Sequence, residues 1–149
     1  MSLKGVLAAA AAVLALGGDV RELGAQPSRA FRVVVHESNP VSSITKEELA
    51  ALFLKKRAWP SGLPAAPTNR PEGDLLRAAF TREIHRKPVA AVVSYWNQQV
   101  FAGRGVPPVE HESDDAVLST VRANPNAIGY VSSDATPGRG VKIVTVVGL

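Results

Sequence analysis

The chain has 149 residues, of which 46% are hydrophobic and 20% charged, so it has enough apolar side chains for one folded domain and too many for a disordered protein. It contains no cysteine, which excludes disulfides, thiolate metal sites and cysteine nucleophiles. The net charge of +4 favours anionic partners, but no stripe of Lys and Arg with interleaved aromatic residues is present, so we expect no nucleic-acid binding.

Residues 1–25 are typical of a secretory signal peptide. Lys4 precedes a compact apolar stretch that is shorter than the roughly 20 residues a membrane span needs. We expect cleavage after Ala25, with cleavage after Gly17 or an uncleaved N-terminal anchor as alternatives. The sequence therefore predicts a periplasmic protein with a single domain over residues 26–149.

The predicted elements begin with a strand and a well-marked helix. The run 31–35 is β-branched and nearly continuous, which is typical of a buried strand. Thr45 and Glu48 have the spacing of a capping box, which predicts that a helix begins after Thr45. The basic run 55–57 ends that helix, where cations suit the helix dipole.

The rest of the chain alternates short strands and helices. Residues 64–68 predict a strand that its two prolines weaken or place at a sheet edge. Apolar side chains at helical spacing predict two helices separated by Pro88, and Ser113 caps a third helix whose first turn is acidic. Two further strands are expected at 127–131 and 141–147.

This order of elements predicts the fold class. Strands separated by helices indicate an α/β domain with a mixed, mostly parallel sheet and flanking helices in a three-layer arrangement. Ligands of such sheets bind beyond the carboxyl ends of the strands, which places Ser38 and Asn39, then Asn69 and Arg70, among the candidate binding residues.

Arg70 is the strongest single candidate for binding an oxyanion. Its guanidinium donates two parallel hydrogen bonds, and a helix begins near Gly73, where free backbone N–H groups suit an anion. The alternative is that Arg70 pairs with Glu72 or Asp74 and only fixes the loop.

No catalytic pattern is present, so we expect neither an enzyme nor a cofactor. The chain lacks a G-x-S-x-G motif and a phosphate-binding P-loop. His36 and His111 each precede a glutamate, but no spacing supports a metal site, and His85 is interpreted as a cation near a helix end. Four aromatic residues are expected in the core: Phe53, Trp59, Trp96 and Phe101.

Three motifs follow one another in a specific order. Residues 41–49 lead into Trp59, residues 69–73 lead into a helix with Phe80, and residues 127–132 close the set. Together they resemble the phosphate-binding solute receptors of ABC importers, the type-2 periplasmic binding proteins, over about residues 31–133. The closest likeness is to the short, single-lobe branch of phosphate ABC transporter substrate-binding proteins.

The resemblance implies a ligand and partners. The ligand would be inorganic phosphate or a similar oxyanion, and the partner an ABC permease or another envelope protein. Because the chain has room for about one lobe, a homodimer or a partner protein would supply the second wall of the cleft. The residues expected to contact the anion are Ser38, Asn39, Asn69, Arg70 and Gly73.

The phosphate loop departs from the family pattern, Arg-x-Asp-x-Ser-Gly-Thr. Arg70 matches and Glu72 approximates the acid, but Asp74, Leu75 and Leu76 stand at the Ser, Gly and Thr positions. An ionised Asp74 repels an anion and donates no hydrogen bond. We therefore expect a solute-binding-protein-like module with a degenerate phosphate loop or, alternatively, an envelope interaction module that has lost its ligand.

Overall fold

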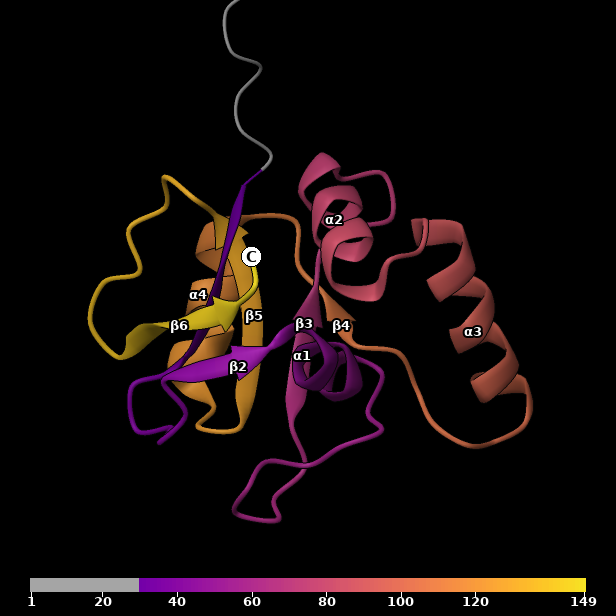
Figure 1. Cartoon of the computed structure of the whole chain (residues 1–149), viewed down its shortest axis with the longest axis horizontal. Coiled ribbons are helices and arrows are strands. Elements are labelled where there is room, and N and C mark those ends of the chain that lie inside the picture. Colours follow the sequence, from indigo (N-terminus) through magenta and orange to yellow (C-terminus); the bar gives the residue numbers. More distant parts are fainter. Residues whose placement is uncertain (1–29) are drawn as a thin grey trace, which may run out of the picture.

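The computed structural model describes residues 30–149, so the predicted signal peptide lies outside the described residues. Within this range six strands form one sheet in the order β2-β6-β1-β5-β3-β4 (Figure 1). The strands are β1 (Phe31–His36), β2 (Ser43–Thr45), β3 (Ala66–Asn69), β4 (Val109–Glu110), β5 (Ala127–Ser132) and β6 (Val141–Val147).

One strand of this sheet runs against all the others. β1 pairs antiparallel with both β5 and β6, whereas the pairs β2–β6, β3–β5 and β3–β4 are parallel. Five strands therefore share one direction and β1 lies reversed among them. This arrangement confirms the predicted mixed, mostly parallel sheet.

The helices flank both faces of the sheet. α1, α2 and the π-helix η1 cover one face and α4 covers the other, while α3 lies beside η1 and away from the sheet (Figure 1). Among the described residues, every helix is too short to cross a membrane. The helices are α1 (Lys46–Phe53), α2 (Leu75–Phe80), η1 (Thr81–His85), α3 (Val89–Phe101) and α4 (Asp114–Ala123).

Helix ends follow the signals in the sequence. Thr45 Oγ1 accepts from the backbone N–H of Glu48 at 3.2 Å, and Glu48 Oε2 accepts from the N–H of Thr45 at 3.1 Å, so the capping box is complete. Ser113 Oγ accepts from the N–H of Ala116 and begins α4. Both predicted helix starts are confirmed.

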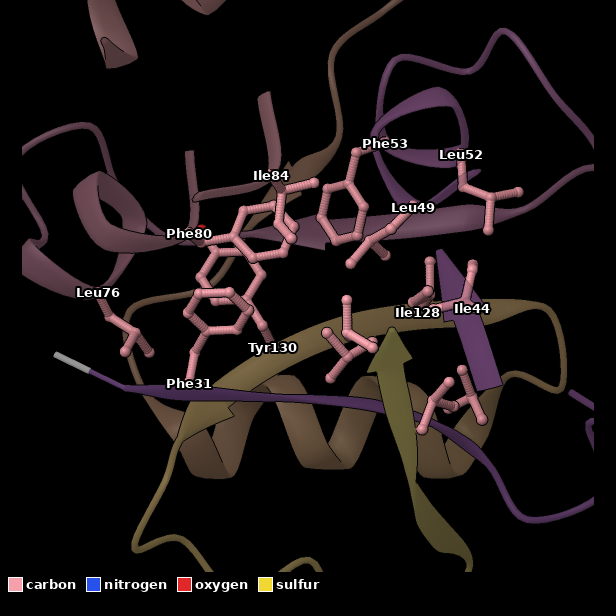
Figure 2. Packing of buried hydrophobic residues seen from close by; sticks show 14 of the residues in the cluster. Phe31, Ile44, Leu49, Leu52, Phe53, Leu76, Phe80, Ile84, Ile128 and Tyr130 are labelled. Carbon is pink, nitrogen blue, oxygen red and sulfur yellow. The ribbon is translucent and has the colours of Figure 1, made fainter. Parts of the chain in front are cut away.

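The core has two parts because side chains alternate along each strand. On β1, Val33 and Val35 point toward α1 and α2, whereas Val34 points toward α4. Figure 2 shows the larger cluster, in which the rings of Phe80 and Tyr130 stack with centroids 3.9 Å apart. The sheet is thus buried on both faces.

Close packing of α4 on β5 depends on Gly129. A Cβ atom at this position would lie 2.6 Å from Val117 Cγ1 and 2.6 Å from Thr68 Oγ1, closer than real Cβ contacts allow. Glycine therefore lets α4 approach the sheet. This approach brings the first turn of α4 to the end of β3.

Three details differ from the sequence prediction. β2 and β4 are too short to give a periodic signal, and both were missed. β3 is not an edge strand, since it lies between β5 and β4, and Pro67 is accommodated because β4 pairs only with Thr68 and Asn69. Phe101 is not a core residue, because it is 97% exposed at the end of α3.

Candidate functional site

The carboxyl ends of β3 and β5 meet at one edge of the sheet. Their parallel pairing brings Asn69, Arg70 and the following loop next to Ser132. This neighbourhood holds three of the predicted site residues, Asn69, Arg70 and Gly73. We refer to it below as the strand-end site.

Ser38 and Asn39 lie at the opposite edge, so the expectation that they join Arg70 is wrong. They follow β1, which runs antiparallel to β5, and they share a hollow with Pro125 and Asn126, which precede β5. Ser38 Oγ lies 2.7 Å from His36 Nδ1, and Asn39 Oδ1 accepts from the N–H of Val41 at 2.9 Å. Both side chains thus serve the loop after β1.

Asn69 is buried and its side chain is used inside the protein. Asn69 Oδ1 accepts a hydrogen bond from the hydroxyl of Tyr130 and another from the N–H of Arg70 at 3.0 Å. Burial raises the pKa of Tyr130, which keeps this hydroxyl protonated as a donor. Asn69 therefore fixes the direction of the chain at Arg70.

The Arg70 guanidinium is bound by two carboxylates of the same chain. Nε and Nη2 of Arg70 each lie 2.9 Å from Asp74 Oδ2, and Nη1 lies 3.5 Å from Asp114 Oδ1. Arg70 is only 9% exposed. The predicted pairing of Arg70 thus involves Asp74, and all three guanidinium nitrogens face carboxylate oxygens.

Each of these carboxylates also holds a backbone group. Asp74 Oδ1 accepts from the N–H of Leu76 at 2.7 Å and caps α2. Asp114 Oδ1 accepts from the N–H of Ser132 at 3.1 Å. The carboxylates therefore occupy the helix start and the strand end where an external anion would find donors.

A second buried cation, Arg77, contacts the loop that follows β3. Its Nη1 donates to the carbonyl oxygen of Arg70 at 2.9 Å and to Glu110 Oε1 at 2.6 Å, while Nε has no partner among the described residues. Sequence reasoning missed Arg77, although a charge between the apolar Leu76 and Phe80 of one helix was a usable signal.

Gly73 leaves space but makes no special contact. It is exposed, and a Cβ atom placed on it would meet nothing within 4 Å. The loop therefore does not require glycine there for steric reasons. Gly73 stays a predicted binding residue only through its place between Arg70 and the start of α2.

The histidines lie apart from one another. His36 ends β1, whereas His111 follows β4 and lies 2.9 Å from Thr120 Oγ1 through its Nε2. Among residues 30–149, no group of three or more potential ligands could hold a metal ion. His85 is not the cation expected at a helix end, since burial, with Lys87 and Arg77 nearby, lowers its pKa to about 4.

No protein-family profile and no curated protein matches the chain. Several solved structures do match the chain. The chain superposes on a phosphate ABC transporter substrate-binding protein with bound phosphate from Clostridium perfringens (TM-score 0.61, 23% identity, 80% of this chain and 45% of that one). It superposes similarly on an ABC-type phosphate transport receptor from Vibrio cholerae (TM-score 0.62, 19% identity, 80% and 46%).

A third structure, a possible phosphate binding protein from Planctomyces limnophilus, matches with a TM-score of 0.58 and 15% identity, covering 78% of this chain and 40% of that one. The chain thus spans less than half the length of each of these proteins. By their names, two of them are binding proteins and the one from Vibrio cholerae is a transport receptor. The resemblance found in the sequence is confirmed at the level of the fold: residues 30–149 have the architecture of part of a phosphate ABC transporter substrate-binding protein.

Proposed function

We propose that this chain is a periplasmic, non-catalytic solute-binding-protein-like module of the phosphate-receptor type, whose strand-end site is closed by its own carboxylates. The observation that carries the proposal is the pairing of Arg70 with Asp74 and Asp114. The module then acts through contacts with another protein of the cell envelope, such as a permease, and not through tight capture of inorganic phosphate.

The charges of the strand-end site support this proposal. Two arginines, Arg70 and Arg77, face three carboxylates, those of Asp74, Glu110 and Asp114. Micromolar binding of phosphate needs about 8 kcal/mol. Two carboxylates within a few ångströms of the phosphate oppose it by about 2 kcal/mol or more at an effective dielectric constant near 20. Phosphate would also have to displace carboxylates that hold the helix start and Ser132.

The share of the neighbour that this chain covers is consistent with the proposal. The chain covers 45% of the phosphate-bound protein from Clostridium perfringens. The described residues therefore supply one wall of a cleft, and a wall whose arginine is neutralised is better suited to protein contact than to solute capture.

Isothermal titration with inorganic phosphate tests the proposal. We expect no saturable heat with the wild-type protein at millimolar phosphate. In Asp74→Ser the hydroxyl still caps α2, the negative charge is gone and Arg70 is partly released. This variant, and more strongly Asp74→Ser combined with Asp114→Asn, should gain measurable binding.

Arg70→Ala in the Asp74→Ser background is the matched control, and it should abolish the gained heat. The proposal is wrong if the wild-type protein binds phosphate in the micromolar range and Arg70→Ala removes that binding. Export is tested separately, because sequencing the N-terminus of the secreted protein should show cleavage after Ala25.

A further inference from the structure

A pocket of about 370 Å³ lies between α1, η1 and α3, away from the strand-end site. Its lining includes the apolar side chains of Leu54, Ile84 and Val92, and the ring of Tyr95 stands at one side. Pockets of 300–1,000 Å³ with an apolar lining and a few polar groups are typical of small-molecule sites.

The charged side chains of this pocket are mostly cations that form no direct ion pair, although Arg86 interacts at longer range with Glu83. Lys56, Arg86 and Lys87 line it together with a single carboxylate, Glu47. Within residues 30–149, none of the three cations lies within 4.0 Å of a carboxylate oxygen. Lys56 instead lies over the ring of Tyr95, 5.1 Å from its centroid.

A neighbouring hollow extends the same positive charge. It shares Arg86 and Lys87 with the pocket, adds Arg82, and has no acidic residue in its lining. α3 begins there after Pro88, with no side-chain cap and no acidic residue in its first turn. The positive end of the α3 dipole therefore adds to the charge of the side chains.

His85 gives the pocket a neutral, polar wall. No described residue forms a hydrogen bond with its ring, which packs edge-on against Phe80 with the centroids 6.0 Å apart. Burial and the cations Lys87 and Arg77 lower its pKa to about 4, so the imidazole is uncharged at neutral pH. It is thus available to donate a hydrogen bond to a bound group.

The backbone around the pocket is strained. Lys55 and Arg86 are the non-glycine residues with positive φ in the described chain, each at 54°, and one precedes Lys56 while the other lines the pocket. Such conformations cost about 1–2 kcal/mol in an L-residue. η1 itself is a π-helix, a rare form that is frequent at functional sites. Arg86 directly follows η1, so the π-helix and the strained residue meet at the pocket.

We propose that this pocket binds a small organic anion, with an apolar or aromatic body on the Leu54, Ile84 and Val92 floor and an anionic headgroup held by Lys56, Arg86 and Lys87. The volume and the apolar lining favour such a molecule over inorganic phosphate, which would leave the floor in contact with water. The unpaired cations favour an anion over a neutral ligand, since each provides a charge-assisted hydrogen bond.

Fluorescence titration with 8-anilinonaphthalene-1-sulfonate tests the proposal, because this sulfonate combines an aromatic body with a fixed negative charge. We expect saturable enhancement with the natively folded protein. Phenyl phosphate should displace the dye, phenol should not, and inorganic phosphate should do so much more weakly than phenyl phosphate. Displacement by phenol as efficient as by phenyl phosphate would overturn the proposal, as would equal displacement by inorganic phosphate.

Variants locate the site. Arg86→Gly combined with Lys87→Gln should weaken dye binding at least tenfold, and glycine suits the positive φ of residue 86, so the fold should be kept. Arg32→Gln, which removes an exposed cation of β1 outside the pocket, is the matched control and should change nothing.

Asp74→Ser should also leave dye binding unchanged, which separates this pocket from the strand-end site. Near-ultraviolet circular dichroism verifies that each variant is folded. Unaltered dye binding by the folded Arg86→Gly, Lys87→Gln double variant would overturn the proposal.

Discussion

The strand-end site and the pocket beside η1 are both cationic, yet they handle charge in opposite ways. In the strand-end site Arg70 and Arg77 are at most 9% exposed, and both are bound by carboxylates. In the pocket Lys56, Arg86 and Lys87 are exposed, form no direct ion pair, and share the lining with one carboxylate, that of Glu47. The loop that resembles the phosphate-binding motif, which begins at Arg70, therefore lies at the site with less unpaired positive charge.

The difference follows from burial. A buried guanidinium without a counter-ion is strongly destabilising, so the fold provides carboxylates where solvent is excluded. A cation at the rim of an open pocket keeps its hydration and needs no internal partner. Whether a site can bind an anion thus depends on whether its cations are left without carboxylate partners inside the protein. An arginine that matches a sequence motif does not by itself show that the site binds an anion.

The largest expected effect is a difference in protein stability between a variant of the strand-end site and a variant of the pocket. Arg70→Ala should lower the free energy of unfolding by about 3 kcal/mol or more, because it leaves Asp74 and Asp114 without their cation. Urea denaturation followed by circular dichroism measures this. Lys87→Gln in the pocket is the control and should change stability by less than about 0.5 kcal/mol. Equal losses in the two variants would contradict the comparison.

The next effect concerns the pH dependence of stability. The pKa of His85 is about 4 in the folded protein, against about 6.5 for an unperturbed histidine. The unfolded chain therefore binds the proton first, and stability should fall as the pH drops from about 6.5 to about 4, by an amount on the order of 3 kcal/mol at most.

In His85→Gln, the free energy of unfolding measured by urea denaturation should change less between pH 4 and pH 8 than it does in the wild-type protein. The charged groups around His85 are Arg77 from α2, Glu47 from α1, and Lys56, Arg86 and Lys87 from the loops. A wild-type curve with the same slope as the variant would show that His85 does not carry the effect. Since a bound anion would raise the pKa of His85, the dye should bind more tightly as the pH falls.

The smallest effect has the opposite sign. Arg86→Gly alone should leave stability unchanged or raise it by up to about 1 kcal/mol, because glycine adopts a φ of 54° without steric cost. Arg86→Ala keeps the strain and removes the same charge, so it is the matched variant. A melting temperature of Arg86→Gly below that of Arg86→Ala would contradict the claim of backbone strain.

The elements with strong local signals were predictable. The capping box of Thr45 and Glu48, the cap at Ser113 and the strand from Val141 to Val147 depend on residues close in sequence. β2 and β4 were not predictable, because a run of two or three residues has no periodicity. Such strands form only by pairing with a neighbouring strand.

The candidate site was predictable only in part. Hydrophobic patterns identify strands but not their direction, so the reversal of β1, which separates Ser38 and Asn39 from Arg70, could not be read from the sequence. The protonation state of His85 could not be predicted from the sequence for a similar reason. Its place near a helix end suggested a cation, but burial by tertiary packing against Phe80 keeps it neutral.

The reversed central strand also constrains when this domain can fold. Phe31 pairs with Ser132 and His36 with Val141, so the first strand obtains both neighbours from the final segments of the chain. A polypeptide emerging from the ribosome therefore lacks both neighbours of β1 until residues 127–147 have been synthesised. Folding dominated by such distant pairings is slow, so the newly made chain should stay unfolded, and open to transport machinery and proteases, for longer than a helical domain of equal length.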